Sequence, residues 1–169
     1  GDHFVINIGR QLGSGGREIG EKLAASLEIS FYDKELINLA SEESGLCRDF
    51  FEKADEKPSQ PLMNGLFGMR FPFPNDSIMA CNSCLSNDAL FKVQSDVIRK
   101  LAAEKSCLFV GRCADYILRD HPRHVNVFVS ASLDDRIERL CQTMHVSKAE
   151  AEELIERTEK KRSEYYNYY

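Results

Sequence analysis

Apolar residues follow two patterns along the chain, a continuous run and a recurrence at intervals of four. The stretch from residue 4 to residue 8 is almost continuously apolar, which is typical of a strand covered on both faces. After a run of glycines, Ile19, Leu23 and Leu27 recur at intervals of four, which predicts an amphipathic helix with these three side chains facing the core. The chain therefore opens with a predicted strand, a glycine-rich turn and a helix.

Predicted strands and helices continue to alternate toward the end of the chain. A short strand ends at Tyr32 and a helix begins near Lys34; the apolar stretch "SCLFV" predicts a buried strand ending at Gly111, and "HVNVFVSAS" a further strand. "SLDD" from Ser132 and "SKAE" from Ser147 are capping boxes that predict two more helices. Alternating strands and helices predict a three-layer α/β/α fold with a parallel sheet.

The segment 57–88 does not follow either period and holds four of the five prolines. Such a long segment inside one domain is usually a lid, a binding loop or disordered, and its apolar content makes full disorder the weaker reading. It also contains Cys81 and Cys84, which have the spacing of half a zinc knuckle or of a redox pair. Free thiols in a loop are the favoured interpretation.

Composition narrows the class of protein. The 169 residues are 43% apolar and 29% charged, which suits one globular domain. A formal net charge of −5 argues against a partner that is a nucleic-acid polymer, and no apolar run is long enough to span a membrane. The six cysteines are scattered, which favours reduced thiols and a cytoplasmic protein. The oligomeric state is not predicted.

The glycine-rich turn has the composition of a phosphate-binding loop. "GSGG", residues 13–16, lies between a buried strand and a helix, where glycines let backbone N–H groups surround an anion. A plain tight turn is the weaker alternative. The dinucleotide fingerprint fits poorly, because Glu18 stands where its third glycine should be, although Asp33 suits the acidic position.

The phosphate-loop pattern G-x-x-x-x-G-K-[ST] also fits only in part. When Gly15 is placed at the second glycine, the lysine position is Gly16 and the first glycine becomes Arg10. Arg17, one place late, and Arg10 are then the candidate cations. The loop therefore predicts phosphate binding without the usual lysine.

The stretch "RQLGSGGREIGEKLAASLEISFYDKELI" closely resembles the opening of the cytidylate kinase-like family, a branch of the P-loop nucleoside monophosphate kinases. "FKVQSDVIRKLAAEKSCLFVGRCADYIL", "VNVFVSASLDDRIERL" and "EKKRSEYYNYY" are similar in the same order. The resemblance implies a core of residues 1–46 and 91–140, an acceptor-binding insertion of about 47–90, and a lid with the C-terminal helix over about 141–169. It also implies a fifth strand after the lid, for which this sequence offers no candidate.

The resemblance implies ATP-dependent phosphoryl transfer, with Mg²⁺, to a nucleoside monophosphate such as CMP or dCMP. No metal-ligating cluster of protein residues is expected. ATP would bind the loop, and arginines would neutralise the transferred group. The implied ATP-binding residues are Arg10, Gly13, Ser14, Gly15, Gly16, Arg17 and Glu18. The implied catalytic residues are Arg17, Arg136, Arg139 and Arg162. The implied acceptor-binding residues are Asp33, Gln94, Arg112 and Asp115.

Two departures from the family pattern leave alternatives open. Cys113 replaces the aspartate that helps to read cytosine, and the loop lysine is missing. A nucleotide-binding regulatory protein that has lost catalysis is therefore a second hypothesis, and a zinc or thiol module around Cys81 and Cys84 is a third. A lysine placed at residue 16 is expected to raise turnover if the site is a degraded kinase.

Overall fold

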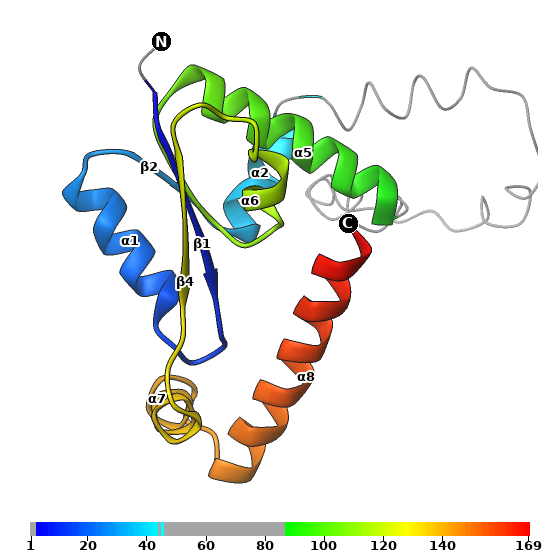
Figure 1. Cartoon of the computed structure of the whole chain (residues 1–169). Helices are drawn as coiled ribbons and strands as arrows, with labels where there is room; N and C mark the ends of the chain where they lie inside the picture. Colours follow the sequence, from blue (N-terminus) through cyan, green and yellow to red (C-terminus); the bar gives the residue numbers. More distant parts are fainter. Residues whose placement is uncertain (1–2, 44, 46–86) are drawn as a thin grey trace, which may run out of the picture. The chain divides into compact units, whose positions relative to one another are not determined.

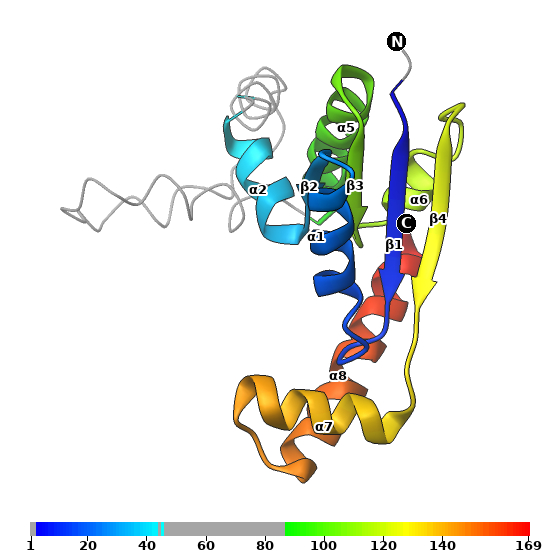
Figure 2. The same ribbon diagram turned by 90° about the vertical axis from the view of Figure 1, so that its left-hand side faces the viewer.

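The sheet is parallel and has four strands in the part of the chain that the structure describes. The computed structural model describes residues 3–43, 45 and 87–169. These fall in two units, Gly1–Ile37 with Ile98–Tyr169, and Asn38–Val97. The strands, in the order β2-β3-β1-β4, are β1 (Val5–Arg10), β2 (Ser30–Tyr32), β3 (Cys107–Val110) and β4 (His124–Val129). Figure 2 shows them side by side in this order.

Helices flank the sheet on both sides. In the first unit α1 lies on one side, and α6 and α8 lie on the other (Figure 1). The helices are α1 (Gly16–Ser26), α2 (Lys34–Glu43), α5 (Asn87–Glu104), α6 (Ala114–Ile117), α7 (Leu133–Met144) and α8 (Lys148–Tyr168). This arrangement confirms the predicted α/β/α class and parallel sheet.

Small residues bring α1 close to the sheet. Gly20 and Ala24 are the residues of this helix that face Ile8 and Leu108 in the core. A Cβ on Gly20 would lie 3.0 Å from the Ile8 Cδ1 atom and 3.1 Å from the Leu108 Cδ2 atom. The helix therefore packs through residues that the apolar period does not mark.

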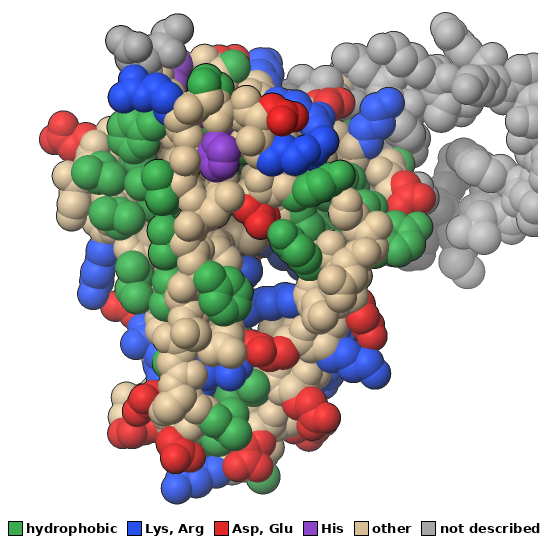
Figure 3. Space-filling model, viewed as in Figure 1, with side chains coloured by type: hydrophobic (Ala, Val, Ile, Leu, Met, Phe, Trp, Pro, Cys, Tyr) green, Lys and Arg blue, Asp and Glu red, His purple; other side chains and the backbone are tan. Residues whose placement is uncertain are grey.

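The prediction that Ile19, Leu23 and Leu27 face the core is wrong. Their exposed fractions are 48%, 36% and 45%. Hydrophobic side chains gather over α1 and β4 on the face shown in Figure 3. In the edge strand β4, Val125 and Phe128 are also exposed. These three apolar residues are therefore not on the face of α1 that packs against the sheet.

Helices α7 and α8 form a hairpin with an apolar centre of its own. Its buried residues are Ile137, Leu140, Ala151 and Ile155, and Leu12 packs against them. The capping box at Ser147 is confirmed, because Ser147 and Glu150 exchange both bonds. At the start of α7, Ser132 caps the Asp135 amide as predicted, but the Asp135 carboxylate accepts from the Ser132 hydroxyl instead of reaching its amide.

Residues 57–86 of the proline-rich segment 57–88, and with them Cys81 and Cys84, lie outside the described residues, while residues 87 and 88 belong to the first turn of α5. Within residues 3–43, 45 and 87–169, no helix is long and apolar enough to cross a bilayer.

Candidate functional site

The glycine loop connects the carboxyl end of β1 to the first turn of α1. Gly13 and Gly15 have φ angles of 80° and 81°, which side-chain-bearing residues rarely adopt. The Ser14 hydroxyl donates to the Gln11 carbonyl at 2.7 Å and accepts from the Gly16 amide at 3.3 Å. The loop thus has the left-handed turns and the adjacent helix start that an anion cradle needs.

The side chain of Arg10 extends past Gly16 toward Gly111, which follows β3. A Cβ on Gly16 would lie 2.5 Å from the Cβ and 3.1 Å from the Cγ of Arg10. A Cβ on Gly111 would lie 2.7 Å from the Arg10 Nη1 atom, so the guanidinium lies at the carboxyl end of β3. The expected gain in turnover from a lysine at residue 16 stays a prediction, and such a lysine would require the stem of Arg10 to shift.

Like charges surround Arg10. Burial, and then the charge of Arg162, lower the pKa of Arg10 to about 10; Arg112 lowers it further, and Asp33 opposes the shift. Arg162 donates from Nη1 to the Arg10 carbonyl oxygen at 3.1 Å, which fixes α8 against the end of β1. We call Arg10, Arg112 and Arg162 the arginine trio.

Arg112 lies in a strained turn and rests on an aromatic ring. Its φ is 57°, and its Cζ atom lies 5.0 Å from the centre of the Tyr165 ring. The Arg112 Nε atom is buried and has no hydrogen-bond partner among the described residues. Beside it, the Tyr166 hydroxyl donates to Asp115 at 3.0 Å. The C-terminal end of α8 thus positions the turn after β3.

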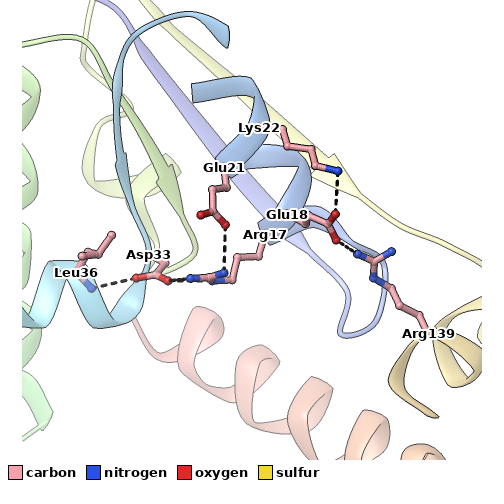
Figure 4. A network of polar contacts seen from close by, with 7 residues as sticks. All are labelled: Arg17, Glu18, Glu21, Lys22, Asp33, Leu36 and Arg139. Atoms are coloured by element: carbon pink, nitrogen blue, oxygen red, sulfur yellow. Dashed lines mark hydrogen bonds and ion pairs between the residues drawn. The ribbon is translucent and has the colours of Figure 1, made fainter. Parts of the chain in front are cut away.

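Arg17 points away from the loop in this structure (Figure 4). Its Nε and Nη2 atoms lie 2.9 Å and 2.8 Å from the Asp33 Oδ2 atom, and Nη1 lies 3.4 Å from Glu21. Asp33 also caps α2 by accepting from the Leu36 amide at 3.0 Å. The role of Arg17 as the phosphate cation stays a prediction, since using it would require breaking the contact with Asp33.

Asp33 keeps its negative charge in spite of burial. Burial alone would raise the pKa of this carboxyl, but the bonds from the Leu36 amide and from Arg17 outweigh it and hold the pKa below its usual value. Asp33 therefore serves both as helix cap and as counter-ion to Arg17.

Arg139 reaches over the loop from α7. Its Cζ atom would lie 3.2 Å from a Cβ on Gly15. Glu18 holds it there with an ion pair, and Glu18 also binds Lys22 at 2.9 Å (Figure 4). Arg139 thus lies directly against the glycine loop, and its catalytic role stays a prediction.

Arg136 has a different environment. It is buried, donates from Nε to the Leu12 carbonyl at 2.8 Å and binds Glu159 through Nη2 at 2.7 Å. Glu159 also accepts from the Leu12 amide at 3.1 Å. These contacts tie the α7–α8 hairpin to the loop, so Arg136 acts as an anchor in this structure.

Gln94 belongs to the other unit. It is buried in α5 and donates to Asn38, while its Oε1 atom has no partner among the described residues. Its predicted acceptor contact stays a prediction. No group of three or more His, Cys, Asp or Glu side chains that could hold a metal occurs in the described part of the chain.

Sequence reasoning did not single out Tyr165, Tyr166 or Glu159 as site residues. Glu159, Arg162 and Tyr165 follow one another at intervals of three along α8, and this spacing places them on one face of a helix. That regular spacing was the available signal. What it could not supply was the partner of each residue on β1, β3 or the loop.

The parallel sheet, the glycine loop after β1 and the arginines at its edge define an α/β/α protein with the fold of phosphate-loop kinases. The chain belongs to the cytidylate kinase-like family, whose model matches residues 5–169. A crystal structure of an uncharacterized protein from Eubacterium ventriosum ATCC 27560 is similar, with 25% identity and a TM-score of 0.68 over 99% of this chain and 78% of that one. No curated protein matches the sequence. Family membership indicates nucleotide kinase-type activity.

Proposed function

We propose that this protein transfers a phosphoryl group from ATP to a nucleoside monophosphate, of the CMP or dCMP type, and releases the diphosphate. The observation that carries the proposal is the meeting of the glycine loop with Arg139 and the arginine trio at one edge of the sheet. Phosphoryl transfer needs this combination, because the enzyme mainly positions two anions and neutralises charge.

The loop would hold the ATP phosphates through backbone N–H groups of residues 13–16. Arg139 would exchange its ion pair with Glu18 for phosphate oxygens. An oxygen of the acceptor phosphate attacks the transferred phosphorus directly, so no protein nucleophile is required. Arg112 and Arg162 would neutralise the group between donor and acceptor.

Magnesium would accompany ATP as its counter-ion. The carboxylate next to the loop, Glu18, is bound to Lys22 and Arg139, and no carboxylate cluster accompanies it in the described residues. The metal is therefore best assigned to the nucleotide phosphates, whose charge it supplements. Free Cys107, Cys113 and Cys141 suit the reducing cytoplasm in which we place this reaction.

The second candidate is a regulatory nucleotide-binding protein without catalysis. Two contacts favour it: Arg17 is held by Asp33, and Glu18 binds Arg139 directly beside the loop. Both carboxylates compete with phosphate for the cations that a kinase would use. On this hypothesis nucleotide still binds but no product forms.

The deciding experiment mixes the full chain with ATP, Mg²⁺ and each of CMP, dCMP, UMP, AMP and GMP, and follows diphosphate formation by chromatography. We expect product with a pyrimidine acceptor, a loss of about ten-fold or more in kcat/KM for Arg139→Gln, and no loss for the exposed control Arg157→Gln. Nucleotide-dependent stabilisation without product from any acceptor would favour the regulatory protein.

A further inference from the structure

Two positions of the phosphate-loop pattern, the first glycine and the lysine, are occupied in this chain by an arginine and a glycine. The pattern G-x-x-x-x-G-K begins with glycine and ends with lysine, and the lysine reaches the phosphates. Here the first position is Arg10 and the last is Gly16. A cation is therefore present in the loop, but at the opposite end of it.

The structure shows that these two positions share one space. A Cβ on Gly16 would lie 2.5 Å from the Arg10 Cβ atom and 3.2 Å from the Cβ of Val129. Contacts under 3.0 Å do not occur between ordinary side chains, so a side chain at residue 16 and the stem of Arg10 exclude each other. The two substitutions therefore make sense only together.

We propose that Arg10 is the phosphate-binding cation of this loop and replaces the lysine, through an exchange in which Gly16 leaves the room that the Arg10 stem needs. The ligand is the phosphate group of a nucleotide. This inference rests on the proposed function for the identity of the nucleotide, while the shared space of Arg10 and Gly16 does not depend on it.

The surroundings of the Arg10 guanidinium support an anionic ligand. It lies against Gly111 at the end of β3, where burial and then the charge of Arg162 lower its pKa; Asp33 opposes this shift, and Arg112 adds a smaller lowering. Among the described residues, no carboxylate lies within ion-pair distance of Arg10 or Arg112. Like charges held together behind partial burial are relieved when a phosphate dianion binds between them.

The other arginines near the loop are less available. Arg17 is bound to Asp33, and Arg136 is bound to Leu12 and Glu159. Figure 3 shows Lys or Arg side chains inside a hollow between the sheet and α8, so cations on this face remain open to a small anion.

A double-mutant cycle tests the exchange itself. Gly16→Lys, Arg10→Gly and the combined variant are compared with the wild type by thermal unfolding. We expect Gly16→Lys alone to lower the melting temperature by about 5 °C or more, and the combined variant to recover most of this loss. Additive effects of the two changes would overturn the shared space, whatever the protein binds.

Calorimetric titration of the folded proteins tests the ligand. Inorganic phosphate, CMP and ATP are titrated into the wild type, Arg10→Gln, Arg10→Lys and the control Arg157→Gln. We expect Arg10→Gln to weaken binding of at least one of them about ten-fold or more, Arg10→Lys to weaken it less, and the control to bind as the wild type does. A loss confined to ATP assigns the donor phosphate to Arg10, and a loss confined to CMP assigns the acceptor phosphate.

The failures of the two proposals can be told apart. Unchanged binding by Arg10→Gln, with the wild type still binding nucleotide, would overturn the role of Arg10 and leave the kinase proposal on the remaining arginines. A wild type that binds none of the three ligands would overturn both. A combined variant Arg10→Gly with Gly16→Lys that binds nucleotide again would support the exchange most directly.

Discussion

Two arginines bracket the glycine loop, and their surroundings are opposite. Arg136 is buried and has two acceptors, the Leu12 carbonyl and the Glu159 carboxylate. Arg10 is half-buried among other arginines, with no ion-pair partner in the described part of the chain. A glycine makes room for each of them, Gly13 beside Arg136 and Gly16 beside Arg10.

The difference separates a structural cation from a binding cation. A buried charge with its hydrogen bonds satisfied holds elements together, and removing it leaves its partners unpaired. A buried charge among like charges costs stability until an anion arrives. Arg162 borders both groups: burial lowers its pKa, and the charge of the neighbouring Glu159 opposes that shift. The anchor and the arginine trio are thus joined through one helix.

The largest effect is expected from Gly13→Ala, which would break the anchored side. Residue 13 has a φ of 80°, and a Cβ there would lie 2.7 Å from the carbonyl oxygen of Arg136. A backbone oxygen cannot move aside as the end of a flexible side chain can. We therefore expect a loss of about 3–4 kcal/mol in the free energy of unfolding. Urea denaturation measures it; Gly45→Ala, also at positive φ but with nothing within 4 Å, is the control for strain alone. Equal losses in the two variants would contradict this account.

Arg136→Met should cost slightly less, about 2–3 kcal/mol, because the Leu12 carbonyl and Glu159 lose their donor. Met keeps the length of the stem, so the loss reports hydrogen bonds and charge. Urea denaturation measures the stability. Limited proteolysis should cut the α7–α8 hairpin faster than in the wild type. A variant as stable as the wild type would show that the anchor does not hold the hairpin.

The elements around both arginines were predictable, because their apolar patterns are local. The strand, the glycine turn and the two capped helices follow from periods and caps within a few residues. The Gly111–Arg112 turn was also placed correctly at the end of a strand. The direction of each arginine was not predictable, since the contacts of Arg10 with Gly111 and of Arg17 with Asp33 join residues distant in the sequence.

The exposed stripe on α1 shows the same limit. Ile19 and Leu23 have the right spacing for a core face, yet the helix packs through Gly20 and Ala24. Small residues carry little hydrophobic signal, although they permit the close approach that decides which face is buried. The pairing of Arg17 with Asp33 was also missed, because Arg17 was assigned to ATP and Asp33 to the acceptor.

Arg10→Met is the same change as Arg136→Met at the other arginine, and we expect it to raise the free energy of unfolding instead of lowering it. It keeps the stem beside Gly16 and removes one of the clustered charges, so we expect the ligand-free protein to gain about 1 kcal/mol. Stabilisation of the wild type by ATP or CMP, measured as a shift in melting temperature, should shrink in this variant. A destabilised Arg10→Met would show that Arg10, too, has a structural role.

The smallest effect concerns Arg17, whose side chain lies at the surface and pairs with Asp33. The pKa of Asp33 lies below its usual value, so its ion pair adds stability above the unfolded pKa of about 4, and this stability is lost as the pH falls through the lower pKa of the folded state. Asp33→Asn keeps a helix cap and removes the charge. Since Arg17 is 57% exposed, we expect this variant to lose only about 0.5 kcal/mol at pH 7 and less at pH 2.5. Urea denaturation of both proteins at the two pH values measures the difference. A difference of the same size at both pH values would show that the charge of Asp33, and with it the pair with Arg17, adds no stability.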